Sequence, residues 1–126
     1  MKRILVVEDN ETNMYLITFI LRNNDYEMLE ARNGEKGVEI AIKEKPDLVI
    51  MDVLLPGIDG LEATKRIRES EADGDIPIVA LTSHAMVGDK EKALAAGCTG
   101  YIEKPINPDT FMAEIEKYLP ALPPKK

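Results

Sequence analysis

The stretch DLVIMDVLLPGIDG, residues 47–60, decides the fold class of this chain. From Leu48 to Met51 it is an unbroken apolar run, which is typical of a strand that is covered on both faces. The carboxylate of Asp52 follows at once, and Pro56 and Gly57 then indicate a turn. The sequence therefore places an acid at the end of its most hydrophobic strand, and this acid calls for an explanation.

Strand-like and helix-like patterns alternate along the rest of the chain. Strands are predicted at residues 4–7, 26–31, 47–51, 76–81 and 100–104, and helices at 11–25, 34–45, 61–69, 89–96 and 109–119. In the second helix we expect Val38, Ile42 and Ala41 to point inward, and Asn107 with Pro108 to cap the last helix. Five strand and helix repeats predict an α/β fold, a doubly wound five-stranded parallel sheet with helices on both faces.

The composition is that of one globular domain. We expect a domain over residues 1–119 and a flexible tail rich in proline and lysine at 120–126. With Cys98 as the only cysteine and His84 as the only histidine, neither an internal disulfide nor a zinc site of Cys/His type can form. A net charge of −7 argues against nucleic acid or a membrane surface as the partner, and the N-terminus lacks a signal-peptide pattern, so we expect a cytoplasmic protein.

Polar side chains stand where four of the predicted strands end. They are Glu8 with Asp9, Asp52, Thr82, and Lys104. Ligands of open parallel sheets bind at this edge, and clustered carboxylates with open coordination positions suit Mg²⁺. A metal site, a lysine and a hydroxyl together predict phosphoryl transfer, in which positioning and charge neutralisation supply most of the catalysis.

Five motifs carry a resemblance to a known family. They are VVEDN (6–10), PDLVIMDVLLPGIDG (46–60), VALTS (79–83), AAGCTGYI (95–102) and EKPI (103–106). Over residues 3–119 the chain resembles a two-component response-regulator receiver (CheY-like) domain, and within that family a free-standing receiver of the DivK type or the receiver of a hybrid kinase. The resemblance implies a flavodoxin-like sheet with strand order 2-1-3-4-5. It also implies a phosphoacceptor signalling domain that assists its own phosphorylation and dephosphorylation, rather than an enzyme.

The resemblance assigns roles to the residues at the strand ends. Asp52 is expected to be the phosphoacceptor, and Glu8, Asp9, Asp52 and the backbone carbonyl of Leu54 are expected to bind Mg²⁺. Glu8 stands where many receivers have aspartate, so its contact with the metal is expected to run partly through water. Lys104 is expected to neutralise a phosphoryl oxygen, and we expect apolar Leu54 to slow the loss of the phosphoryl group.

The resemblance also implies a switch and two kinds of partner. Thr82 is expected to bind the phosphoryl group and Tyr101 to turn inward in response, while a cis bond before Pro105 aims Lys104 into the site. A histidine kinase or a histidine phosphotransfer protein would donate the phosphoryl group, and a downstream protein would bind residues 86–118 of a monomer or of a phosphorylation-dependent dimer. Candidate residues for docking the donor are Asn10, Asn13 and Met14.

Two other functions agree less well with the residues. A phosphatase of the haloacid-dehalogenase type also uses an aspartate with Mg²⁺, but it needs a second acid two positions later, where this chain has Leu54. A nucleotide- or flavin-binding module needs a glycine- or hydroxyl-rich phosphate loop after the first strand, and here acids occupy that place. For His84, a role in the loop is favoured over one as a catalytic base.

Overall fold

The computed structural model describes residues 2–70, 76–82 and 89–119, and side chains from position 91 onward in the last range. His84, the tail at 120–126 and the start of the predicted output surface at 86–88 therefore lie outside the described residues. Strands and helices alternate as predicted. In chain order they are β1 (Arg3–Val7), α1 (Glu11–Asn23), β2 (Glu27–Ala31), α2 (Gly34–Glu44), β3 (Leu48–Asp52), α3 (Gly60–Ser70), β4 (Ile78–Thr82), α4 (Asp89–Ala96), β5 (Gly100–Glu103) and α5 (Phe111–Glu116).

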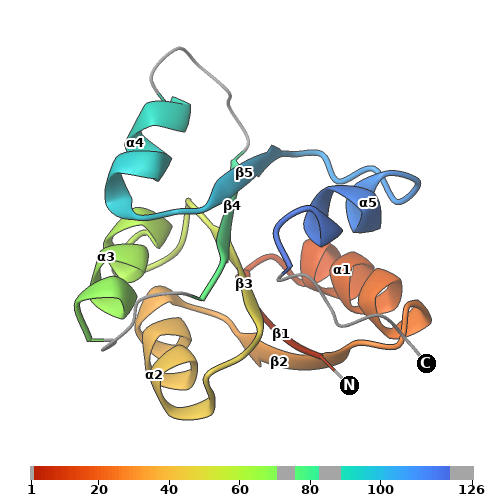
Figure 1. Ribbon diagram of the computed structural model, residues 1–126, viewed down its shortest axis with the longest axis horizontal. Coiled ribbons are helices and arrows are strands. Elements are labelled where there is room, and N and C mark those ends of the chain that lie inside the picture. Colours follow the sequence, from red (N-terminus) through yellow and green to blue (C-terminus); the bar gives the residue numbers. More distant parts are fainter. Residues whose placement is uncertain (1, 71–75, 83–88, 120–126) are drawn as a thin grey trace.

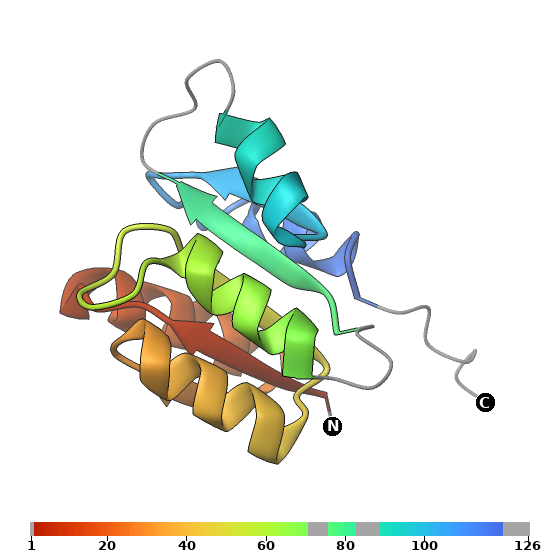
Figure 2. The ribbon, with the colours of Figure 1, turned by 90° about the vertical axis from the view of Figure 1, so that its left-hand side faces the viewer.

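The five strands form one parallel sheet in the order β2-β1-β3-β4-β5, which confirms the predicted fold. Helices α1 and α5 cover one face of the sheet, and α2, α3 and α4 cover the other (Figure 1). Figure 2 shows these last three helices side by side in front of the strands. Strand β3 lies in the middle of the sheet, so the residue at its end is enclosed by neighbouring strands.

The apolar run of β3 is buried because the sheet is covered twice. Leu48 and Ile50 pack in the core beneath α1 and α5, whereas Val49 and Met51 pack in the core beneath α2, α3 and α4. All four are fully buried. Side chains of a strand alternate between faces, so a run without polar residues is what two apolar cores require.

Two details of the helices differ from the sequence prediction. In α2 the buried residues are Gly34, Gly37 and Ala41, as predicted for Ala41, whereas Ile42 is 40% exposed, so its predicted inward position was wrong. Helix α5 begins at Phe111 with Thr110 as its N-cap, so the cap predicted at Asn107 and Pro108 was wrong; the side chain of Asn107 instead accepts a hydrogen bond from the backbone of Asp109 (2.9 Å) in a separate turn. Among the described residues, the helices fall short of the length and hydrophobicity that a bilayer crossing demands.

Candidate functional site

Three carboxylates converge at the edge of the sheet where the strands end. Strands β1 and β3 are neighbours, with Val7 opposite Met51, so the residues that follow them meet in space. One oxygen each from Glu8, Asp9 and Asp52 lies within 4.8 Å of the others. Such a set of hard oxygen donors matches the ligands that Mg²⁺ prefers.

A lysine from β5's end neutralises part of this cluster. The Nζ atom of Lys104 donates a hydrogen bond to Oδ2 of Asp52 (3.0 Å) and lies 3.2 Å from Oε1 of Glu8. The backbone N–H of Lys104 donates to the carbonyl of Thr82 (2.7 Å), and the bond between Lys104 and Pro105 is cis, as expected. The end of β5 thus places the ammonium group against two carboxylates of the cluster.

The electrostatics of the site centre on Glu8, whose side chain is fully buried. Burial raises the pKa of Glu8 to about 7, and the neighbouring carboxylate of Asp52 acts in the same direction. Burial lowers the pKa of Lys104, but the hydrogen bond and charge of Asp52, together with the charge of Glu8, raise it more, so that it ends above its usual value.

The same carboxylate has an incomplete set of partners. Oε2 of Glu8 accepts a hydrogen bond from the backbone of Asn10 (3.2 Å), whereas Oε1 accepts none from the residues that the structure describes. The ammonium of Lys104, 3.2 Å from Oε1, offsets part of the cost of burying this charge, and a divalent cation would offset more. The residues present therefore fit a divalent metal ion.

The other predicted residues surround Asp52 from neighbouring elements. The backbone N–H of Leu54 donates to Oδ1 of Asp52 (3.3 Å), and the side chain of Leu54 is 64% exposed at the lip of the site. Thr82 ends β4, one residue beyond the register partner of Asp52. Tyr101 lies on β5, next to β4, and is half-buried. The structure thus brings every predicted strand-end residue to one edge.

The predicted docking residues fare differently. The side chain of Asn10 caps α1 by accepting a hydrogen bond from the backbone of Asn13 (2.9 Å). Met14 is only 2% exposed, so its side chain is unavailable to a partner and that part of the prediction was wrong. Helix α1 instead exposes two aromatic side chains among its polar ones, Tyr15 at 74% and Phe19 at 56%. These two residues were not predicted from the sequence. Because they are four positions apart and outside the buried stripe, their spacing could have identified an exposed aromatic face of the helix.

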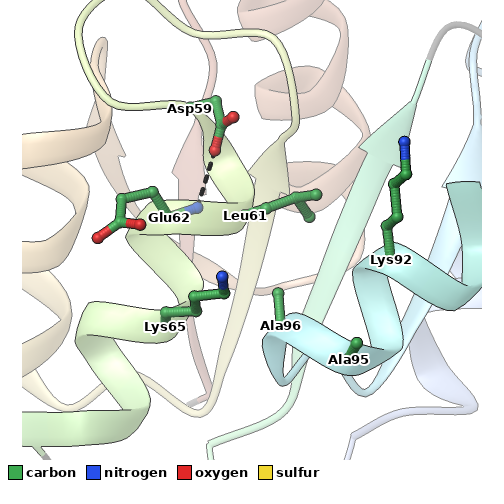
Figure 3. A pocket seen from close by; sticks show the side chains of 7 residues that line it. All are labelled: Asp59, Leu61, Glu62, Lys65, Lys92, Ala95 and Ala96. Carbon is green, nitrogen blue, oxygen red and sulfur yellow. Dashed lines mark hydrogen bonds between the residues drawn. The ribbon is translucent and has the colours of Figure 1, made fainter.

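A second hollow lies between α3 and α4, away from the acidic cluster (Figure 3). It has a volume of about 410 Å³. Its lining residues are Asp59, Leu61, Glu62, Lys65, Lys92, Ala95 and Ala96. Since it includes none of the carboxylates of the cluster, we do not assign it to the same site.

Comparisons with known proteins agree with this geometry. Residues 4–116 match the family model of the response regulator receiver domain. The polar-differentiation response regulator DivK of Brucella anthropi is 40% identical over 118 residues, which are 94% of this chain and 96% of that protein. The receiver domain of the sensor histidine kinase PA1611 of Pseudomonas aeruginosa, solved with a magnesium ion in its active site cleft, has a TM-score of 0.85 and 35% identity over 93% of this chain and 96% of that one. A chain from the co-crystal structure of the Saccharomyces cerevisiae histidine phosphotransfer protein Ypd1 and the receiver domain of Ssk1 has a TM-score of 0.86 and 33% identity over 93% of this chain and 88% of that one.

Proposed function

The chain belongs to the response regulator receiver family of two-component signalling, and from this premise we propose that Asp52 accepts a phosphoryl group from a histidine of a partner protein. One observation carries the proposal. Asp52 is 3% exposed, its carboxylate lies 3.0 Å from the ammonium of Lys104, and one of its oxygens lies within 4.8 Å of an oxygen of Glu8 and of Asp9. A nucleophile so enclosed is held in one position, with a charge partner already beside it.

The transfer follows from the contacts of the two oxygens of Asp52. One of them attacks the phosphorus atom, the bond from phosphorus to the histidine nitrogen breaks, and an acyl phosphate forms. Lys104 then has a phosphoryl oxygen to neutralise in place of the carboxylate. Glu8, Asp9, Asp52 and the carbonyl of Leu54 are the proposed ligands of Mg²⁺, which supplies charge neutralisation for the phosphoryl oxygens.

The proposed readout lies on β4 and β5. Thr82 binds the new phosphoryl group, and Tyr101 changes its position in response, which alters the surface formed by α4, β5 and α5. A phosphoryl group adds roughly −1.5 to −2 charges, enough to bias a loop with two arrangements. The downstream partner is a protein, and phosphorylation controls its binding, either to a monomer or through a dimer.

The phosphodonor, a histidine kinase or a histidine phosphotransfer protein, has to cover the opening above Asp52. The exposed Leu54 borders this opening, and Tyr15 and Phe19 lie on α1, the helix that begins beside it. Exposed aromatic residues are common anchors of protein interfaces. We therefore assign donor docking to this face of α1, with residues 1–119 acting as one cytoplasmic receiver domain.

The test is intact-protein mass spectrometry after incubation with acetyl phosphate and Mg²⁺. One added phosphoryl group, removed by hydroxylamine, is expected in the native chain and in Asp47→Asn, a matched change at the opposite end of β3. It is expected to be absent from Asp52→Asn and from a sample with EDTA. Failure of the folded native protein to gain the group would refute the proposal, and steady release of phosphate from small esters would favour the phosphatase instead.

A further inference from the structure

Helix α3 begins in direct contact with the backbone of Asp52. A Cβ atom built on Gly60 would lie 2.1 Å from the carbonyl oxygen of Asp52, 2.9 Å from its carbonyl carbon and 2.9 Å from Cα of Val53. All three are backbone atoms, which cannot rotate away as the end of a flexible side chain can. The space for any side chain at this position is therefore already occupied by the end of β3.

The contact is fixed by hydrogen bonds on both sides of Gly60. Its N–H donates to the carbonyl of Val53 (2.9 Å), and its carbonyl accepts from the buried hydroxyl of Thr64 (2.8 Å). Just before it, the side chain of Asp59 accepts a hydrogen bond from the backbone N–H of Glu62 (2.8 Å) and caps the helix (Figure 3). The first turn of α3 and the last residue of β3 thus form one connected unit.

Helix α3 is also held against outward movement. Ala63 and Ile67 are fully buried in the core beneath it, and Arg68 donates to the carbonyl of Gly97 (2.9 Å). The end of β3 is held as well, because the N–H of Val53 donates to the carbonyl of Leu81 (3.0 Å), and the chain becomes exposed only from Leu54 onward. A steric push between two segments that are both held is therefore expected to displace the end of β3 and not the helix alone.

We propose that Gly60 is a positioning residue for the phosphoacceptor, an inference that rests on the proposed function of Asp52. A Cβ atom would force the two backbone segments apart by about 1 Å to restore an ordinary contact. A displacement of about 1 Å at a reacting group costs on the order of 100-fold in rate. Gly60→Ala is therefore expected to slow phosphorylation by acetyl phosphate about 100-fold at saturating Mg²⁺.

The experiment compares Gly60→Ala with Gly100→Ala and the native chain. Gly100 is the control for a new Cβ atom elsewhere in the sheet, because its Cβ would lie 2.4 Å from the ring of Tyr118, a side chain that can move, at the start of β5 and away from Asp52. Unfolding by urea, Mg²⁺ affinity by calorimetry and phosphorylation rate are measured at a temperature at which all three are folded. The NMR shift of the Leu54 amide, which donates to Asp52, reports on the carboxylate directly.

Both variants are expected to be less stable than the native chain. Only Gly60→Ala should be phosphorylated more slowly and show a changed NMR shift of the Leu54 amide. A phosphorylation rate of Gly60→Ala within twofold of that of Gly100→Ala would overturn the proposal, because α3 would then have moved instead of Asp52. If Gly60→Ala does not fold in buffer, the same comparison is made in a stabilising osmolyte such as sucrose, and equal phosphorylation rates of the two variants there would overturn the proposal.

Failure of the proposed function would look different. The native chain would then remain unphosphorylated, and the role of Gly60 would be decided by the amide shift and the Mg²⁺ affinity alone. A change of both in Gly60→Ala, but not in Gly100→Ala, would support positioning of Asp52. No change in either would overturn it.

Discussion

Lowering the pH from 8 to 6 is expected to weaken the binding of Mg²⁺ about tenfold, because Glu8 takes up a proton in that range. The pKa of this buried carboxyl is raised to about 7, and a protonated carboxyl is a poor metal ligand. Lys104 does not contribute to the change. Its pKa is raised above its usual value, so it stays protonated throughout.

The magnitude follows from the titration of one group. With a pKa of about 7, Glu8 is roughly nine-tenths ionised at pH 8 and roughly one-tenth ionised at pH 6, a ratio of about ten. The raised pKa has a second consequence of known sign. The folded chain holds this proton more tightly than the unfolded chain does, so metal-free stability should fall as the pH rises from about 4.5 to about 7.

Isothermal titration calorimetry at pH 6, 7 and 8 measures the affinity, with Glu8→Gln as the control. Glutamine keeps the length of the side chain but does not titrate, so this variant should bind Mg²⁺ more weakly at pH 8 and with little dependence on pH. Equal slopes for the native chain and Glu8→Gln would refute the reasoning. The proton whose uptake weakens Mg²⁺ binding would then bind to a group other than Glu8, and the raised pKa of Glu8 would not affect metal affinity.

Three further changes test other parts of the site. Leu54→Asn should shorten the half-life of the acyl phosphate several-fold in Mg²⁺ buffer, because it replaces an apolar lip with a side chain that can orient water; an unchanged half-life would exclude this role. Lys104→Ala should slow phosphorylation and lower the free energy of unfolding at pH 8 by about 2 kcal/mol, since two buried carboxylates lose their cation, and urea unfolding measures the loss. Phe19→Ala should slow phosphotransfer from a histidine phosphodonor about tenfold, as one lost aromatic anchor does, without altering phosphorylation by acetyl phosphate. Leu94→Ala, a comparable exposed apolar residue on α4, should change neither rate, and an equal effect of the two variants would argue against docking on α1.

The sequence predicts the elements that local pattern determines. The apolar run before Asp52 identifies the central strand. Polar residues at the strand ends identify the edge of the sheet where Glu8 and Asp9 lie close to Asp52. Helical spacing predicts that a residue lies on a stripe but not how deep the stripe is buried. For this reason Ile42 was assigned to the core, whereas it is exposed. Met14 was assigned to a partner because it lies near the start of the helix beside the site, whereas it is buried.

Contacts between distant segments were beyond prediction from pattern alone. The glycine at position 60 looks like an ordinary turn residue in the sequence, and only the path of the loop that returns α3 to β3 shows why a side chain does not fit there. The full burial of Glu8 likewise depends on its place in the folded sheet, because the acid next to it, Asp9, is exposed. Burial and close approach are properties of the whole fold, so no window of sequence contains them.

The pairing of Lys104 with two carboxylates sets the formal charge of the site. Three ionised carboxylates and one ammonium leave a formal charge of −2, which one divalent cation cancels. A monovalent ion would leave the cluster anionic and a trivalent ion would leave it cationic, so the formal charge of the cluster favours a divalent ion. A neutral pocket is also the one that a phosphate ester or phosphohistidine, itself an anion, can approach without repulsion.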